Sequence, residues 1–123
     1  MKRYVTILLL ALISLGVQAQ KQISYIKQDG SWYMVYDESG KKVTTVSKSS
    51  VGEVVGWGSD FFVTHDGSWN KIFDMNGKRI NTFSVSSMGN VIAVSGNTIT
   101  FKNGSFIKIY DKTGKLIKTL SAR

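Results

Sequence analysis

The chain of 123 residues contains no cysteine and no proline, and it has a single histidine. Without cysteine it can form neither disulfides nor thiolate metal sites, and it cannot use a cysteine nucleophile. One histidine without cysteine would leave only carboxylates as further zinc ligands. We therefore expect no metal and no cofactor, and a domain that its hydrophobic core alone must stabilise.

Amphipathic helices are also missing from the sequence pattern. No segment after residue 20 shows a sustained apolar period of 3.6 residues, so we expect no helix there. Short runs rich in β-branched and aromatic residues alternate instead with Gly, Asn, Asp and Ser. This pattern is typical of an all-β chain.

The first 19 residues have the layout of a secretory signal peptide. Lys2 and Arg3 precede an apolar run from Tyr4 to Val17, and Val17-Gln18-Ala19 is typical of a cleavage site. The alternative is a transmembrane anchor, but the run is shorter than the about 20 residues that cross a bilayer. We predict cleavage after Ala19, a periplasmic or extracellular location, and no membrane span in the mature chain.

The predicted mature chain is basic. Loss of the signal peptide leaves 14 basic and 8 acidic residues, a net charge of +6. The lysines are scattered, with no block of the kind that forms a polybasic arm. The charge favours acidic glycans or envelope surfaces over nucleic acid as partners, but an ordinary basic surface without a ligand is the preferred interpretation.

One phrase occurs three times at a spacing of 37 residues: DGSWYMVYDESGK at 29–41, DGSWNKIFDMNGK at 66–78 and NGSFIKIYDKTGK at 103–115. Without gaps, 13 of the 27 residues at 29–55 are identical to those at 66–92. Repeat periods of about 20–50 residues indicate solenoids, propellers or arrays. We predict one repeat domain over residues 20–123, with units of about 20–50, 51–87 and 88–123.

Each complete unit is predicted to form four antiparallel strands, which in the second unit cover 53–57, 61–65, 68–73 and 78–85. Asp66-Gly67 is predicted to form a type I′ hairpin turn, which needs positive φ at both central residues. Asp74 is predicted to bind its own backbone in the longer turn that ends at Gly77. Asp37 and Asp111 occupy the same position in the other units.

The end of the third unit, Lys108-Ile-Tyr-Asp-Lys-Thr-Gly-Lys-Leu-Ile-Lys-Thr-Leu120, resembles the end of a WD-repeat propeller blade, with Tyr-Asp in place of Trp-Asp. Phe73-Asp74 and Tyr36-Asp37 repeat this pattern. The Gly-His dipeptide of WD repeats is absent, and the unit is shorter than their about 40 residues. The resemblance is thus to propeller blades in general, and it implies a β-propeller-like fold with three blades per chain.

Only two of the three units are complete, because the first strand of the first unit would fall within the signal peptide. Propellers typically have about 4–8 blades, and open strand edges invite pairing with another chain. We expect a homodimer that closes a six-bladed ring. The alternative is a monomer whose strands form one curved meander sheet.

Candidate ligand-binding residues are those that the repeat does not require. We select three residues that differ from their equivalents in the other units: Trp57 (Val94), Tyr33 (Asn70, Ile107) and His65 (Gln28, Lys102). Trp57 would lie on a first strand, which lines the central channel of a propeller. Trp32, Trp69 and Phe106 are instead equivalent to one another, so we expect them to pack in the core rather than to bind sugars.

No catalytic constellation is visible in the sequence. Glu38 and Glu53 are the only glutamates, and neither lies in the apolar surroundings that a glycosidase acid requires. His65 has no nucleophile at a known spacing. We predict an exported, non-enzymatic binding module for a glycan or an envelope component. The alternative is a structural or protein-interaction subunit that uses its strand edges, and a hydrolase is the least favoured function.

Overall fold

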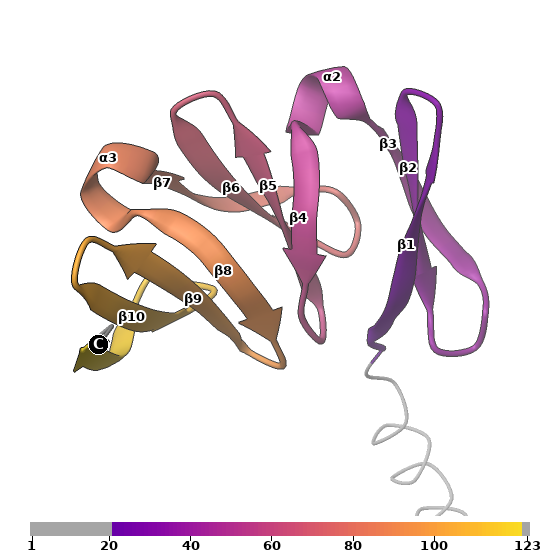
Figure 1. The fold of residues 1–123 in the computed structure, drawn as a ribbon. Helices are drawn as coiled ribbons and strands as arrows, with labels where there is room; N and C mark the ends of the chain where they lie inside the picture. The colour runs from indigo at the N-terminus through magenta and orange to yellow at the C-terminus, as the bar shows by residue number, and fades with distance from the viewer. Residues whose placement is uncertain (1–20, 122–123) are drawn as a thin grey trace, which may run out of the picture.

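The computed structural model describes residues 21–121, so the predicted signal peptide lies outside the described residues. Antiparallel strands predominate, and the predicted all-β class is confirmed (Figure 1). The strands are β1 (Ile23–Asp29), β2 (Trp32–Asp37), β3 (Lys42–Ser47), β4 (Glu53–Trp57), β5 (Phe61–Asp66), β6 (Trp69–Asp74), β7 (Arg79–Ser84), β8 (Asn90–Ser95), β9 (Thr98–Asn103), β10 (Phe106–Asp111) and β11 (Leu116–Ser121).

The strands form three separate sheets. Sheet 1 contains β1–β3, sheet 2 contains β4–β7, and sheet 3 contains β8–β11, each as a simple meander. Figure 1 shows sheet 2 standing between the other two, in a blade-like arrangement. The separate sheets contradict the alternative of one curved meander. Within residues 21–121, sheet 1 has three strands, as expected for a unit without its first strand.

The repeat extends to the turns. Each β-hairpin between the second and third strand of a unit has a glycine with φ of 62°, namely Gly30, Gly67 and Gly104. Asp66 pairs with Trp69, so Gly67 and Ser68 form the loop, and only the glycine has positive φ. The predicted type I′ turn is therefore wrong. Glycine at the first central position alone is the feature of a type II′ turn.

Two helices were not predicted. α2 (Lys48–Val51) and α3 (Val85–Met88) are single turns that follow β3 and β7. A helix of four residues is too short to produce an apolar period in the sequence, which explains the wrong prediction. The backbone N–H of Lys48 donates to the Ser31 carbonyl at 2.8 Å, and that of Val85 to the Ser68 carbonyl at 2.9 Å. Each helix is thereby tied to the hairpin loop of its own sheet.

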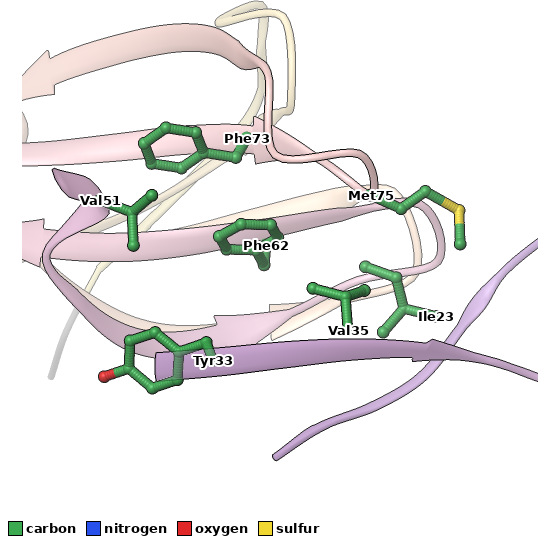
Figure 2. Close-up of a cluster of buried hydrophobic side chains, with 7 residues drawn as sticks. All are labelled: Ile23, Tyr33, Val35, Val51, Phe62, Phe73 and Met75. Atoms are coloured by element: carbon green, nitrogen blue, oxygen red, sulfur yellow. The ribbon is translucent and has the colours of Figure 1, made fainter. Parts of the chain in front are cut away.

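Two hydrophobic clusters fill the spaces between the sheets. The cluster between sheets 1 and 2 contains Ile23, Tyr33, Val35, Val51, Phe62, Phe73 and Met75 (Figure 2). The cluster between sheets 2 and 3 contains Phe61, Val63, Ile72, Ile99 and Phe101. Successive strand residues point to opposite faces, so Phe61 and Phe62 enter different clusters. Sheet 2 is thus covered on both faces.

Backbone hydrogen bonds also link the three sheets at one end. The N–H of Ile23 in sheet 1 donates to the Ser59 carbonyl at 2.6 Å, and the N–H of Ser59 donates to the Gly96 carbonyl at 2.7 Å. Ser59 and Gly96 are equivalent positions of the repeat. The loop after the first strand of one unit therefore holds the corresponding loop of the next unit.

Candidate functional site

Trp57 lies at the end of β4, where its register partner is Phe62 on β5. Directly paired residues project from the same face of a sheet, so Trp57 lies on the face of sheet 2 that is turned toward sheet 1. Its side chain is 36% exposed, whereas Phe62 is completely buried. Trp57 therefore stands at the open margin of the space between these sheets.

Val94, the equivalent of Trp57 in sheet 3, shows why this margin is open. Val94 packs against the second cluster and contacts β4 so closely that a Cβ on Gly56 would lie 2.9 Å from its Cγ2. The first strand of sheet 2 thus covers Val94. Sheet 1, as far as the structure describes it, has no first strand to cover Trp57 in the same way. The exposure of Trp57 follows from that difference.

Tyr33 lies in the core between sheets 1 and 2 and is 4% exposed. Figure 2 shows its ring beside the other side chains of the cluster. Its hydroxyl oxygen accepts the backbone N–H of Val54 at 3.2 Å. At the equivalent position Asn70 is also buried, and its Nδ2 donates to the Gly89 carbonyl at 3.2 Å. Both polar groups therefore bind the backbone of the following unit, a role that their different residue types concealed in the sequence.

His65 lies on the other side of sheet 2. It pairs with Asn70, so it projects toward sheet 3, and its Nδ1 lies 3.4 Å from the Asn70 Oδ1. Trp57 and Tyr33 instead lie between sheets 1 and 2. The structure does not bring these three sequence-predicted residues together in one site.

A hollow of about 750 Å³ opens at the end of the molecule where the sheets are linked. Its lining combines Val43 and Met75 with polar residues, namely Lys21, Gln22, Ser59, Asp60, Asp74, Asn76 and Asn97. The Nζ of Lys112 in sheet 3 binds both Asp60 carboxylate oxygens, at 2.8 and 2.7 Å. One of the two carboxylates that line the hollow is thus already neutralised by a lysine of the chain itself.

The aromatic residues predicted to pack in the core are half-exposed. Trp32 is 51% exposed, Trp69 48% and Phe106 53%. Each is the first residue of its strand, beside the hairpin loop at the rim of its sheet. Trp69 lies on the sheet face that carries Phe73, and Phe106 lies on the sheet face that carries Tyr110. Both of these sheet faces are turned toward another sheet. Trp69 and Phe106 are nevertheless as exposed as Trp32, so their position at the rim decides their exposure.

The same types of polar residue flank the two rim tryptophans, Trp32 and Trp69. Trp32 pairs with Asp29 on one side and Ser47 on the other, and Trp69 pairs with Asp66 and Ser84. The Ser47 and Ser49 hydroxyls lie 2.7 Å apart, and those of Ser84 and Ser86 lie 2.8 Å apart. We call Trp32, Asp29, Ser47 and Ser49 rim set 1, and Trp69, Asp66, Ser84 and Ser86 rim set 2. Repetition in the sequence indicated these positions, but it did not indicate that they are exposed.

The aspartates of the longer turns bind their own backbone, as predicted. The Oδ1 of Asp37 accepts the N–H groups of Ser39 and Lys41 at 2.9 and 3.1 Å, and that of Asp74 accepts those of Asn76 and Lys78. The Ser39 hydroxyl also donates to Asp37 at 2.6 Å, which lowers the pKa of this carboxyl group below its ordinary value. The Thr113 hydroxyl lowers the pKa of Asp111 in the same way.

Within residues 21–121, no three side chains of the types His, Cys, Asp and Glu come together in a way that could hold a metal ion. The same part of the chain has no helix that is long and apolar enough to cross a membrane. The chain matches no protein-family model, and a search of curated proteins finds no similar sequence.

Proposed function

We propose that the chain is a non-enzymatic binding module that works as a head-to-tail pair of copies, with six sheets in one ring. One observation carries this proposal. Sheets 1 and 3 each leave one face open among the described residues, and each open face is the repeat equivalent of a face that is buried within the chain.

The open face of sheet 1 carries Tyr25 and Tyr36, whose rings stack at a centroid distance of 4.9 Å. Their equivalents 37 residues later are Phe62 and Phe73, which stack at 5.3 Å and are covered by sheet 1. Tyr25 is 45% exposed. Large exposed aromatic surfaces of this kind are typical of protein interfaces.

The open face of sheet 3 is apolar as well. It carries Ile107, Ile109 and Leu120, of which Leu120 is exposed and both isoleucines are half-buried. Ile109 is the equivalent of Val35 and Ile72, which are completely buried where another sheet follows. A second copy would supply the missing sheet, since its sheet 1 could pack on sheet 3 as sheet 3 packs on sheet 2.

The contacts between sheets predict which residues of two copies would meet. Met75 in a turn of sheet 2 shares a buried cluster with Ile23 of sheet 1. At the equivalent positions, Lys112 of sheet 3 binds Asp60 of sheet 2 at 2.7 Å. If a second copy places its sheet 1 on sheet 3, the residues at these same two repeat positions are Asn97 of the first copy and Glu38 of the second. Their side chains, an amide and a carboxylate, can form a hydrogen bond.

Cysteine cross-linking tests the pair directly, because the chain has no cysteine of its own. We expect the double variant Glu38→Cys, Asn97→Cys to form a covalent dimer under mild oxidation, and light scattering to give twice the chain mass for the unmodified protein. The matched control is Glu38→Cys, Ser86→Cys, because Ser86 lies on α3 away from the loop of Asn97. A monomer without cross-links, or a ladder of longer oligomers, would contradict the closed pair.

The predicted export of the chain makes glycans and envelope components the accessible partners of such a module. The turn carboxylates of Asp37, Asp74 and Asp111 are occupied by backbone N–H groups, which supports binding rather than acid–base chemistry. Trp57, at the margin between sheets 1 and 2, would face the centre of the ring.

A further inference from the structure

The rim sets combine a flat apolar surface with hydrogen-bonding groups in a fixed arrangement. In rim set 1 the half-exposed indole of Trp32 stands between the Asp29 carboxylate and the Ser47 hydroxyl, because all three occupy one register row of sheet 1. The hydrogen bond from the backbone N–H of Lys48 to the Ser31 carbonyl holds α2 against the β1–β2 hairpin. The same local structure recurs in rim set 2.

We propose that rim set 1 binds a neutral saccharide, with the sugar ring stacked on Trp32. A pyranose has an apolar C–H face, which an indole can cover, and a periphery of hydroxyl groups. Asp29 accepts hydrogen bonds from two such hydroxyls, and charge-assisted hydrogen bonds are about twice as strong as neutral ones. The Ser47 and Ser49 hydroxyls bind on the other side of the ring. The negative charge of Asp29 disfavours acidic sugars.

The three units differ in what binds the side chain that pairs with the rim aromatic. Asp29 is exposed, and no hydrogen bond or ion pair joins its side chain to another of residues 21–121. In rim set 2 the Nζ of Lys71 binds Asp66 at 2.8 Å. In sheet 3 the equivalent Asn103 donates its Nδ2 to the Ser87 carbonyl at 3.0 Å. Asp29 is thus the rim carboxylate with both oxygens available to ligand hydroxyls among residues 21–121.

Exposed aromatics with nearby lysines are also typical of proteins that bind membrane surfaces. The rim carboxylates argue against this alternative, because insertion of Trp32 and Trp69 would carry Asp29 and Asp66 into the interface. Removing a carboxylate from water without a partner is strongly unfavourable. A membrane surface is therefore an outcome that the experiment must separate from saccharide binding.

This inference rests on the proposed binding role of the chain, but not on the pairing of two copies. Trp69 has a neighbouring sheet on its side, whereas no sheet of the described residues covers the side of Trp32, yet both are about half-exposed. A second copy placed on sheet 1 would therefore leave Trp32 accessible. Saccharide binding and pairing can succeed or fail separately.

The experiment titrates residues 20–123 with hexasaccharides of glucose, mannose and N-acetylglucosamine, using calorimetry and tryptophan fluorescence. We expect at least one of them to bind, and Trp32→Ala and Asp29→Asn each to weaken its affinity about tenfold or more. Trp32→Phe should retain most of the affinity, because phenylalanine already occupies the equivalent position 106. Ile92→Ala is the matched control, because Ile92 on β8 is an apolar side chain as exposed as Trp32 and lies in neither rim set, and it should leave the affinity unchanged.

Three results would overturn the inference: no binding of any hexasaccharide at millimolar concentration, equal loss of affinity in Ile92→Ala, or Trp32-dependent partition onto phosphatidylcholine–phosphatidylglycerol vesicles without saccharide binding. Melting curves of each variant show whether the fold is retained. Light scattering on the same samples reports pairing, so a dimer that binds no sugar contradicts only this inference, and a monomer that binds sugar contradicts only the ring.

Discussion

Two aromatic pairs of the chain have the same geometry and opposite surroundings. Phe62 and Phe73 stack with an interplanar angle of 17°, and Tyr25 and Tyr36, at the equivalent positions, stack with an angle of 7°. The phenylalanines are buried between sheets 1 and 2. The tyrosines lie on the open face of sheet 1. The repeat thus determines how two rings meet across a strand pair, whereas the neighbouring sheet determines whether water reaches them.

The difference in residue type follows the difference in surroundings. The open pair has hydroxyl groups, and that of Tyr36 lies 3.7 Å from the Met34 sulfur. Tyrosine is suited to surfaces that are apolar on one side and wet on the other. The residue types on the open face of sheet 1 are therefore compatible with contact to water.

The largest expected effect is on the buried pair. Phe62→Ala should lower the free energy of unfolding by about 3–5 kcal/mol, because it leaves a cavity between two sheets. Tyr25→Ala should lower it by less than about 1 kcal/mol in a dilute, unpaired chain. Urea unfolding followed by tryptophan fluorescence measures both values.

Repeating these measurements at high protein concentration sharpens the comparison. If two copies pair as proposed, Tyr25→Ala should weaken the dimer, and only the unmodified chain should gain stability with concentration. Equal losses for Phe62→Ala and Tyr25→Ala in dilute solution would show that the open face is buried in the chain itself.

A smaller effect distinguishes two glycines of the repeat. A Cβ at Gly89 would overlap the Lys102 carbonyl oxygen, whereas a Cβ at Gly30 would meet nothing within 4 Å. Both residues have positive φ. Gly30→Ala should therefore lower the free energy of unfolding only by the cost of placing alanine at positive φ, about 1 kcal/mol. Gly89→Ala should lower it by clearly more. Thermal melts compare them, and similar melting temperatures would contradict the close contact between α3 and sheet 3.

The smallest effect is a pH dependence that separates turn aspartates with and without a hydroxyl donor. The Ser39 hydroxyl lowers the pKa of Asp37 below its ordinary value of 3.8. A carboxyl group whose pKa is lower in the folded state stabilises the fold above its unfolded pKa, and this contribution is lost as the pH falls through the folded pKa. Stability should therefore decrease as the pH falls below about 4.

Ser39→Ala is the matched test of this prediction. It removes the strongest cause of the shift and should move the acid decrease of the melting temperature toward higher pH. Asp37→Asn should be less stable at neutral pH and less sensitive to acid. An acid limb that is unchanged in both variants would exclude Asp37 as a contributor.

Much of the fold could be predicted because repetition and turn chemistry are local. The strand Glu53–Trp57 has its predicted bounds, and the turn aspartates have their predicted role. The hairpin type was wrong because Gly67 and Ser68, rather than Asp66 and Gly67, form the loop. The sequence pattern shows a turn, but pairing across the hairpin decides which residues are unpaired.

The candidate site was less predictable because exposure depends on distant segments. Tyr33 differs from its equivalents and looked free to bind a ligand, but it is buried and bonded to Val54. Trp32 and Trp69 are repeated and looked structural, but they are half-exposed. Repetition of a residue indicates a repeated environment, and that environment can be a surface as well as a core.

The sequence by itself determined the period of 37 residues, the order of strands and turns, and the aspartate of each longer turn. These features depend on contacts between residues near one another in the chain. Only the tertiary structure decided which faces are covered. Within residues 21–121 it covers sheet 2 twice and sheets 1 and 3 once, and it leaves Trp57 and the rim sets exposed. Burial is a property of neighbouring sheets, and equivalent residues of a repeat do not have equivalent neighbours.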